Sequence, residues 1–108
     1  KHLPIDCPPD QSQVKGKAVF HHYCLMLKHD RAWIQEQMSL DGIECIAYYP
    51  RALHQQTLYL KRTQSLPRAE HYAKFNLALP LFPELQASEL DYIVQTFEKH
   101  LLKLEAIL

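Results

Sequence analysis

The sequence is poor in the features that mark disulfide-bonded, membrane-spanning or nucleic-acid-binding proteins. It has only three cysteines, Cys7, Cys24 and Cys45, and none stands in a C-x-x-C or metal-ligand spacing. No run approaches the ~20 apolar residues of a membrane span, and residues 1–11 lack the apolar core of a signal peptide. Acidic and basic residues number 12 each, so no basic face is expected for nucleic acid or an anionic membrane. We therefore expect a cytoplasmic protein with free thiols and without either of these partners.

The length and the apolar content predict one domain with one modest core, because 47% of the 108 residues are hydrophobic. Residues 1–16 hold Pro4, Pro8 and Pro9, which disfavour a helix or an inner strand. This stretch is expected to be an extended lead-in to a domain over residues 17–108. The chain begins with Lys rather than Met, as a fragment of a longer polypeptide or a processed chain would.

Three apolar stretches predict a small sheet. Residues 17–27 are apolar on both alternating faces, as in a strand covered on two sides, and residues 43–49 alternate as a second strand. Residues 77–79 end at Pro80 and fit an edge strand. The predicted fold class is α/β, of the α+β kind, with a small, mainly antiparallel sheet and helices on one face. Another domain or subunit is expected to cover the second face, because so short a chain supplies helices for only one.

Two predicted helices have recognisable ends. Asp30 is placed to cap a helix over residues 31–41 that stops at Gly42. Pro67 fits the first position of a second helix, which extends to about Phe75.

The last predicted helix is amphipathic. Its start is expected at one of two capping pairs, Gln86 with Glu89 or Ser88 with Asp91. Its apolar stripe recurs at three- and four-residue steps and consists of Leu90, Ile93, Val94, Phe97, Leu101, Leu104 and Leu108.

The side chains best suited to bind a ligand gather in residues 42–56, GIECIAYYPRALHQQ. The strand expected here breaks at Pro50 into a loop, so it delivers polar side chains to its own end. These side chains are Tyr48, Tyr49, Arg51 and His54. Their position predicts a binding site.

Several motifs follow one another along the chain in a particular order. They are H-H-Y at 21–23, G-I-E at 42–44, Y-P-x-x-L-H-Q at 49–55, P-x-A-E at 67–70, LALPLFPEL at 77–85 and E-L-D-Y-I at 89–93. In order and spacing they resemble the C-terminal domain of the DegT/DnrJ/StrS family of nucleotide-sugar aminotransferases, which use pyridoxal phosphate (PLP). The family usually has His-Tyr-Pro where this chain has Tyr48-Tyr49-Pro50.

The resemblance implies the small C-terminal domain of a fold-type-I aminotransferase, which packs on a large domain and closes one side of the active site. A lysine of that large domain holds PLP, and no lysine here stands in the family's cofactor motif. The parent enzyme implied is a homodimer that transfers an amino group, usually from glutamate, to a nucleotide-linked keto sugar for polysaccharide or glycan biosynthesis. The chain alone is expected to bind no PLP and to be inactive.

The resemblance also implies roles for the loop. His54 would bind a sugar hydroxyl or a phosphate, and Tyr48, Tyr49 and Arg51 would complete the substrate side. The alternatives are a solvated histidine, a tyrosine packed in the core and a solvated arginine. For the whole chain the alternative is a freestanding, non-catalytic module that binds a protein or a ligand.

Seven histidines raise the question of a metal site. His21 and His22 are adjacent and are expected on opposite faces of a strand, and the others have no ligand spacing. We therefore expect neither a metal site nor a catalytic residue in this chain.

Overall fold

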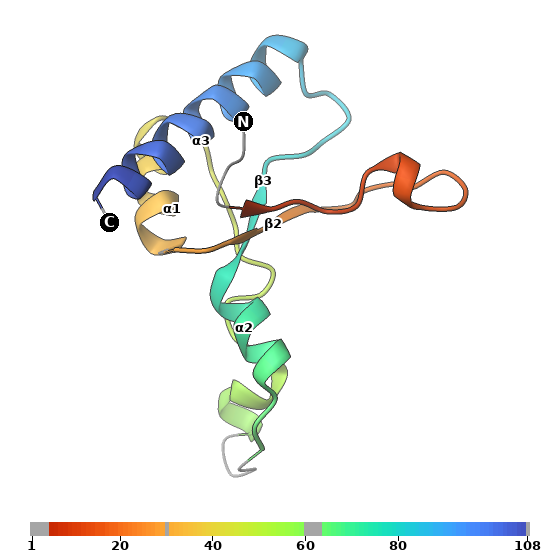
Figure 1. The fold of residues 1–108 in the computed structure, drawn as a ribbon, viewed down its shortest axis with the longest axis vertical. Helices are drawn as coiled ribbons and strands as arrows, with labels where there is room; N and C mark the ends of the chain where they lie inside the picture. The colour runs from red at the N-terminus through yellow and green to blue at the C-terminus, as the bar shows by residue number, and fades with distance from the viewer. Residues whose placement is uncertain (1–4, 30, 60–63, 108) are drawn as a thin grey trace.

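The protein has a three-stranded antiparallel sheet at its centre, and the computed structural model describes residues 5–29, 31–59 and 64–107 (Figure 1). The strands lie in the order β1-β2-β3 and are β1 (Ile5–Asp6), β2 (Tyr23–Leu27) and β3 (Asn76–Leu79). The helices are α1 (Arg31–Leu40), α2 (Pro67–Phe75) and α3 (Ala87–Ile107), with short 3-10 turns η1 (Gln11–Gln13), η2 (Leu53–Gln55) and η3 (Thr57–Tyr59). The predicted α+β class is confirmed.

The core lies between one face of the sheet and the helices α1 and α3. Odd-numbered positions of the two longer strands, Leu25, Leu27 and Leu77, point into it. Ile34 and Met38, one turn apart on α1, are completely buried against them. The helix α1 ends close to the predicted stop, where Gly42 has a φ of 81° that favours glycine. Asp30, the predicted cap, lies outside the described residues.

The helix α3 is present as predicted, but its buried face differs from the predicted stripe. Leu90 and Val94 are about half exposed, whereas Thr96 and His100 are buried. The His100 imidazole bonds to Asp41 just after α1, which keeps this side of α3 inward and leaves Leu90 and Val94 toward solvent. The remaining predicted stripe residues, Ile93, Phe97, Leu101 and Leu104, are buried as expected, and Leu108 lies outside the described residues.

The start of α3 distinguishes the two predicted capping pairs. The backbone N–H of Gln86 donates to the Glu89 carboxylate at 2.8 Å, so this pair is the one used.

None of the described helices is long and apolar enough to cross a membrane.

Prolines shorten the strand predicted over residues 17–27 to the five residues of β2. Tyr23 pairs with Leu79, which is the last residue of β3 before Pro80, so the residues before Tyr23 have no strand partner on this side. On the other side β1 pairs Asp6 with Met26 and runs soon afterwards into Pro8. Residues 17–22 therefore lie outside the sheet.

The strand predicted over residues 43–49 is wrong. Ile46 forms a single antiparallel bridge with Ala78, and no strand is assigned around it. In that register Glu44 faces Pro80, which cannot donate, and the N–H of Tyr48 is taken by the side chain of Asn76. The third strand is instead β1, which belongs to the predicted lead-in.

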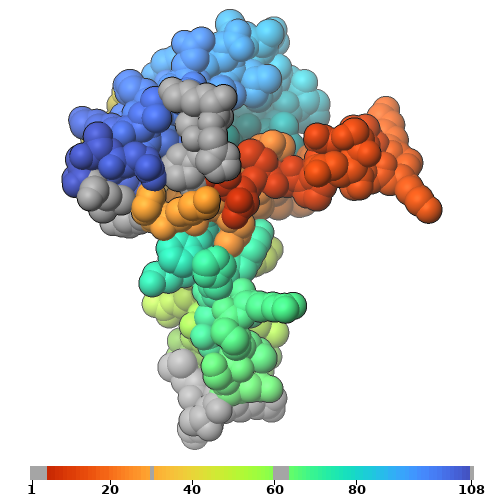
Figure 2. Space-filling view, viewed as in Figure 1, coloured from red at the N-terminus to blue at the C-terminus, as the bar shows by residue number. Residues whose placement is uncertain are grey.

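Two segments project from the core, residues 7–22 on one side and residues 48–59 with residues 64–75 on another (Figure 2). The radius of gyration is 15.6 Å, whereas a compact domain of this length has about 13 Å. The projections carry exposed apolar side chains, among them Val19, Leu53 and Leu58. Exposed apolar side chains gathered on projecting segments are typical of surfaces that another part of a protein covers.

Candidate functional site

Tyr48 and Tyr49 lie where the second projection joins the sheet. The ring of Tyr48 stacks on His22, with centroids 3.9 Å apart and an angle of 18° between the planes. Tyr49 is 70% exposed and meets the Tyr48 ring edge-on at 5.8 Å. The structure thus brings these two predicted site residues together, with one ring packed and the other presented outward.

His21 and His22 lie on the same side of the chain, which corrects the prediction of opposite faces. Their rings are 3.9 Å apart, because both residues precede β2 and the alternation of a strand does not apply to them. Together with Tyr48 they form a stack of three rings. This stack borders a small hollow of about 210 Å³, whose other walls include Glu44 and Pro80.

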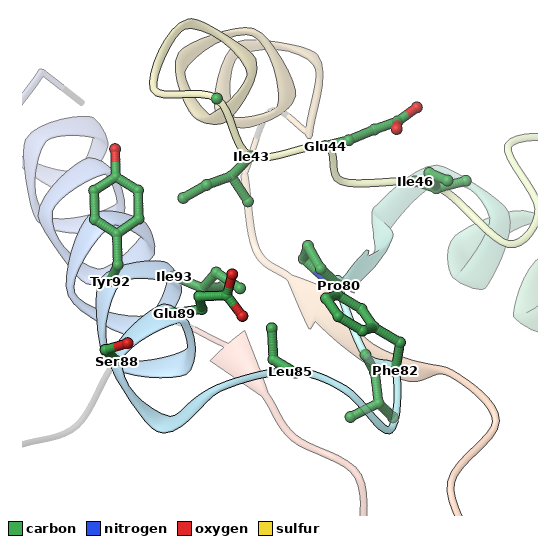
Figure 3. A pocket seen from close by; sticks show the side chains of 12 residues that line it. Ile43, Glu44, Ile46, Pro80, Phe82, Leu85, Ser88, Glu89, Tyr92 and Ile93 are labelled. Carbon is green, nitrogen blue, oxygen red and sulfur yellow. The ribbon is translucent and has the colours of Figure 1, made fainter.

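A larger groove of about 650 Å³ adjoins this hollow (Figure 3). Its walls are residues 42–46, residues 80–85 and the first turns of α3. Glu89 brings its carboxylate to the groove, whereas the carboxylate of Glu44 points away from it, and Ile43, Ile93 and Leu85 make an apolar floor. The two hollows share Glu44, Ile46, Pro80 and Leu81, and so form one continuous depression at this end of the sheet.

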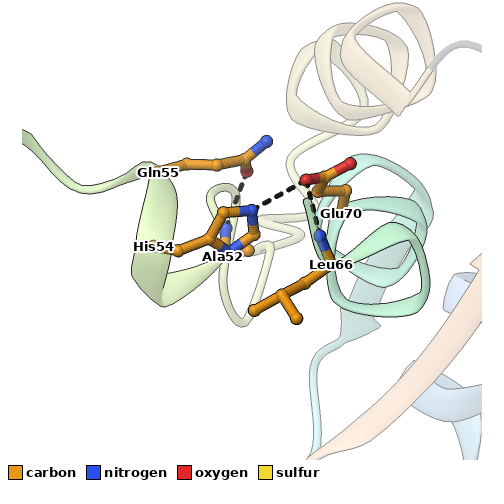
Figure 4. Close-up of polar contacts among 5 residues, drawn as sticks. All are labelled: Ala52, His54, Gln55, Leu66 and Glu70. Carbon is orange, nitrogen blue, oxygen red and sulfur yellow. Dashed lines mark hydrogen bonds and ion pairs between the residues drawn. The ribbon is translucent and has the colours of Figure 1, made fainter. Parts of the chain in front are cut away.

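His54 makes its side-chain contact within the second projecting segment. Its Nε2 lies 2.8 Å from a carboxylate oxygen of Glu70 on α2, and its side chain is only 11% exposed (Figure 4). The same oxygen of Glu70 accepts the N–H of Leu66. These two bonds, the one from His54 first, hold the pKa of the Glu70 carboxyl below its usual value. The imidazole therefore ties η2 to the start of α2.

The four predicted site residues are distributed over two places. Tyr48 and Tyr49 lie at the sheet, His54 is paired with Glu70, and Arg51 is exposed on the loop between them. Their roles in substrate binding stay predictions.

Three residues important to this site were not among the predicted ones. His22 supports the Tyr48 ring, Glu70 engages His54, and Asn76 binds the backbone of Tyr48 and Tyr49. The H-H-Y motif was a signal for the first, and the P-x-A-E motif for the second. Asn76 carries no such signal, because its importance comes from complete burial beside a distant loop.

The described lysines do not fit a covalent PLP site. All six of them are exposed, and Lys74 borders a shallow hollow beside His29 and Arg31. A lysine that forms a Schiff base needs a site that desolvates or otherwise activates its amine. Within the described ranges there is also no group of three or more His, Cys, Asp or Glu residues that could hold a metal ion.

The fold and the site together define a small α+β domain with a polar and aromatic depression at one end of its sheet. The chain belongs to the DegT/DnrJ/EryC1/StrS aminotransferase family, whose model matches residues 1–98. The predicted resemblance is thereby confirmed.

Two curated relatives illustrate the relationship. A "pleiotropic regulatory protein" from Geobacillus stearothermophilus is 39% identical over 83 residues, which are 71% of this chain and 21% of the relative. A UDP-N-acetyl-3-dehydro-alpha-D-glucosamine 3-aminotransferase from Acidithiobacillus ferrooxidans is 33% identical over 84 residues, which are 77% of this chain and 22% of the relative. The chain thus spans about a fifth of the length of these relatives.

Solved structures show the same fold. The aminotransferase TlmJ from Streptoalloteichus hindustanus matches with a TM-score of 0.81 and 25% identity, over 94% of this chain and 27% of that one. A putative sugar aminotransferase from Streptococcus pneumoniae, solved in its PMP form, matches with a TM-score of 0.70 and 26% identity, over 77% of this chain and 22% of that one.

Proposed function

We propose that this chain is the C-terminal small domain of a PLP-dependent aminotransferase that moves an amino group, from glutamate, to a nucleotide-linked keto sugar. The observation that carries the proposal is the family match over residues 1–98, combined with coverage of only about a fifth of the curated relatives. In this proposal residues 17–108 form the small domain, β1 adds an edge strand to its sheet, and the lead-in that contains β1 connects the domain to a large PLP domain. The product would serve polysaccharide or glycan biosynthesis in the cytoplasm.

The projecting shape supports an assembled parent enzyme. Residues 7–22, 48–59 and 64–75 expose apolar side chains that no other described part of the chain covers. The large domain and a homodimer partner would cover these surfaces. When bound in the large domain, PLP supplies the electron sink for transamination.

Within the small domain we assign the substrate side to the loop after residue 47. Tyr49 and Arg51 are exposed and free to meet a hydroxyl or a phosphate of a nucleotide sugar. Tyr48 forms a wall against His22, and His54 keeps the loop attached to α2 through Glu70.

The first test compares the 108-residue chain with the complete polypeptide. The chain mixed with PLP is expected to show neither a specific aldimine absorbance nor turnover of glutamate, because its described lysines are all exposed to solvent. The complete polypeptide is expected to show both, with a nucleotide-linked keto sugar as the amino acceptor. Saturable PLP binding at one lysine of the short chain would contradict the domain assignment. A complete polypeptide that binds no PLP would favour the non-catalytic binding module instead.

The second test concerns His54 in the complete enzyme. His54→Ala is expected to raise the KM for the nucleotide sugar about two- to tenfold, the worth of one hydrogen bond, with a smaller effect on the glutamate half-reaction. Steady-state kinetics with each substrate varied would measure this. The matched control is His29→Ala, which removes another histidine–carboxylate pair, to Glu105, far from the loop. Equal KM values for wild type and His54→Ala would assign His54 a structural role only.

A further inference from the structure

Asn76 occupies the junction between α2 and β3 and is the single asparagine of the sequence. Its side chain is completely buried. The carboxamide oxygen accepts the N–H of Tyr48 at 2.7 Å, and the amide nitrogen donates to the carbonyl of Tyr49 at 3.1 Å. One side chain thus holds both residues of the aromatic pair by their backbone.

The same carboxamide also closes the end of α2. Its nitrogen donates to the carbonyl of Tyr72 at 2.8 Å and lies 3.4 Å from that of Ala73, and the backbone N–H of Asn76 also bonds to the Tyr72 carbonyl. Only a carboxamide offers an acceptor on one side and two donor hydrogens on the other at this length. The position of Tyr48 and Tyr49 is therefore tied to the end of α2.

Arg31 secures the junction from the helix α1. Its Nη1 donates to the carbonyls of Ala73 at 2.6 Å and Asn76 at 3.1 Å. The backbone of Asn76 is thereby connected to the core. This connection matters, because a side chain can orient a loop only if its own position is determined by packing.

We infer that Asn76 is a positioning residue, which sets the Tyr48–Tyr49 backbone and, through it, the stack of Tyr48 on His22 at the wall of the depression. Asn76 would thus determine the shape of the depression without touching a ligand itself. An effect of Asn76 on the binding of a nucleotide sugar rests on the proposed function. Its effect on the position of Tyr48 and Tyr49 does not.

Hydrogen exchange in the 108-residue chain tests the structural half. Selective ¹⁵N-asparagine labelling gives a single side-chain NH₂ group, whose protons are expected to be protected in the wild type. In Asn76→Ala the Tyr48 amide is expected to exchange on the order of tenfold faster relative to the amides of α3, since it loses its acceptor. Asn76→Asp keeps an acceptor for the Tyr48 N–H, so this amide is expected to be better protected than in Asn76→Ala, and most so at low pH, where the protonated carboxyl can also donate to one of the facing carbonyls.

A matched control separates positioning from general loss of stability. Gln35→Ala removes another carboxamide that donates to a backbone carbonyl, that of Cys45, at 2.9 Å. This variant is expected to leave the relative exchange of the Tyr48 amide unchanged. Side-chain protons of Asn76 that exchange in the wild type like those of a free amide would overturn the inference, and this measurement needs no variant to fold.

Kinetics of the complete enzyme test the functional half. Asn76→Ala is expected to raise the KM for the nucleotide sugar on the order of tenfold with a smaller change in kcat, and Gln35→Ala is not. An unchanged KM together with a released Tyr48 amide would overturn the role in substrate positioning. A complete polypeptide without aminotransferase activity would refute the proposed function, and the exchange data would still decide whether Asn76 positions the loop.

Discussion

Replacing Phe97 by Ala is expected to lower the free energy of unfolding by about 3–5 kcal/mol. The ring is 4% exposed and belongs to the cluster in which α3 packs against α1 and the sheet. Removing it takes away the transfer free energy of the ring and leaves a cavity that the surrounding side chains fill only partly. Such a loss is a large part of the total stability of a small domain. Urea unfolding followed by circular dichroism measures it.

The control for this change lies on the same helix. Val94 is 49% exposed, so Val94→Ala is expected to change the free energy of unfolding by less than about 0.5 kcal/mol. Both substitutions place alanine in α3, so the difference between them reports burial rather than helix propensity. Similar midpoints for the two variants would show that the buried face of α3 is assigned wrongly.

Removing the Asp41 carboxylate is expected to destabilise the protein much more when His100 is present than when it is absent. The imidazole Nε2 lies 2.6 Å from the carboxylate, and the side chain of His100 is 7% exposed. Its Nδ1 is buried without a hydrogen-bond partner among the described residues. A buried polar group that loses its remaining partner costs about 1–3 kcal/mol.

A double-mutant cycle measures this coupling. Asp41→Ala alone leaves the buried imidazole without a hydrogen-bond partner. Asp41→Ala combined with His100→Leu replaces both groups and is expected to recover most of the lost free energy of unfolding. Urea midpoints of the wild type, the two single variants and the double variant complete the cycle. Additive effects of the two substitutions would show that the pair contributes no coupling between α1 and α3.

The pH dependence provides an independent readout of the same pair. The hydrogen bond from His100, and then the charge of Lys99 3.5 Å away, keep the pKa of the Asp41 carboxyl below its ordinary value of 3.8. The unfolded chain therefore binds a proton at a higher pH than the folded one does. The stabilisation is complete above pH 3.8 and is lost as the pH falls through the lower pKa of the folded state. This acid-dependent loss should be smaller in Asp41→Ala.

Local structure was predictable wherever neighbouring residues decide it. Gly42 ends α1 and Pro67 opens α2 as expected, because each acts through its own backbone conformation or missing N–H. Ile34 and Met38 are both buried, since residues four apart share a helix face. The family motifs were readable for a similar reason, since each is a short run of adjacent residues.

The candidate site was only partly predictable. Tyr48 and Tyr49 are adjacent, so their proximity followed from the chain itself. The contact between His54 and Glu70 joins residues 16 apart, and the hydrogen bond from Tyr48 to Asn76 joins residues 28 apart. Neither contact has a periodicity or a spacing that a sequence displays.

By itself, then, the sequence determined the helix ends, the apolar spacing of α1, the α+β class and the family. Only the tertiary structure decided which segment became the third strand, where Pro80 and the side chain of Asn76 left residues 43–49 with a single bridge. It also decided which side of α3 is buried, because Asp41 holds His100 inward while Val94 faces solvent. The physical reason is common to both, since strand pairing and helix rotation depend on partners far away in the chain.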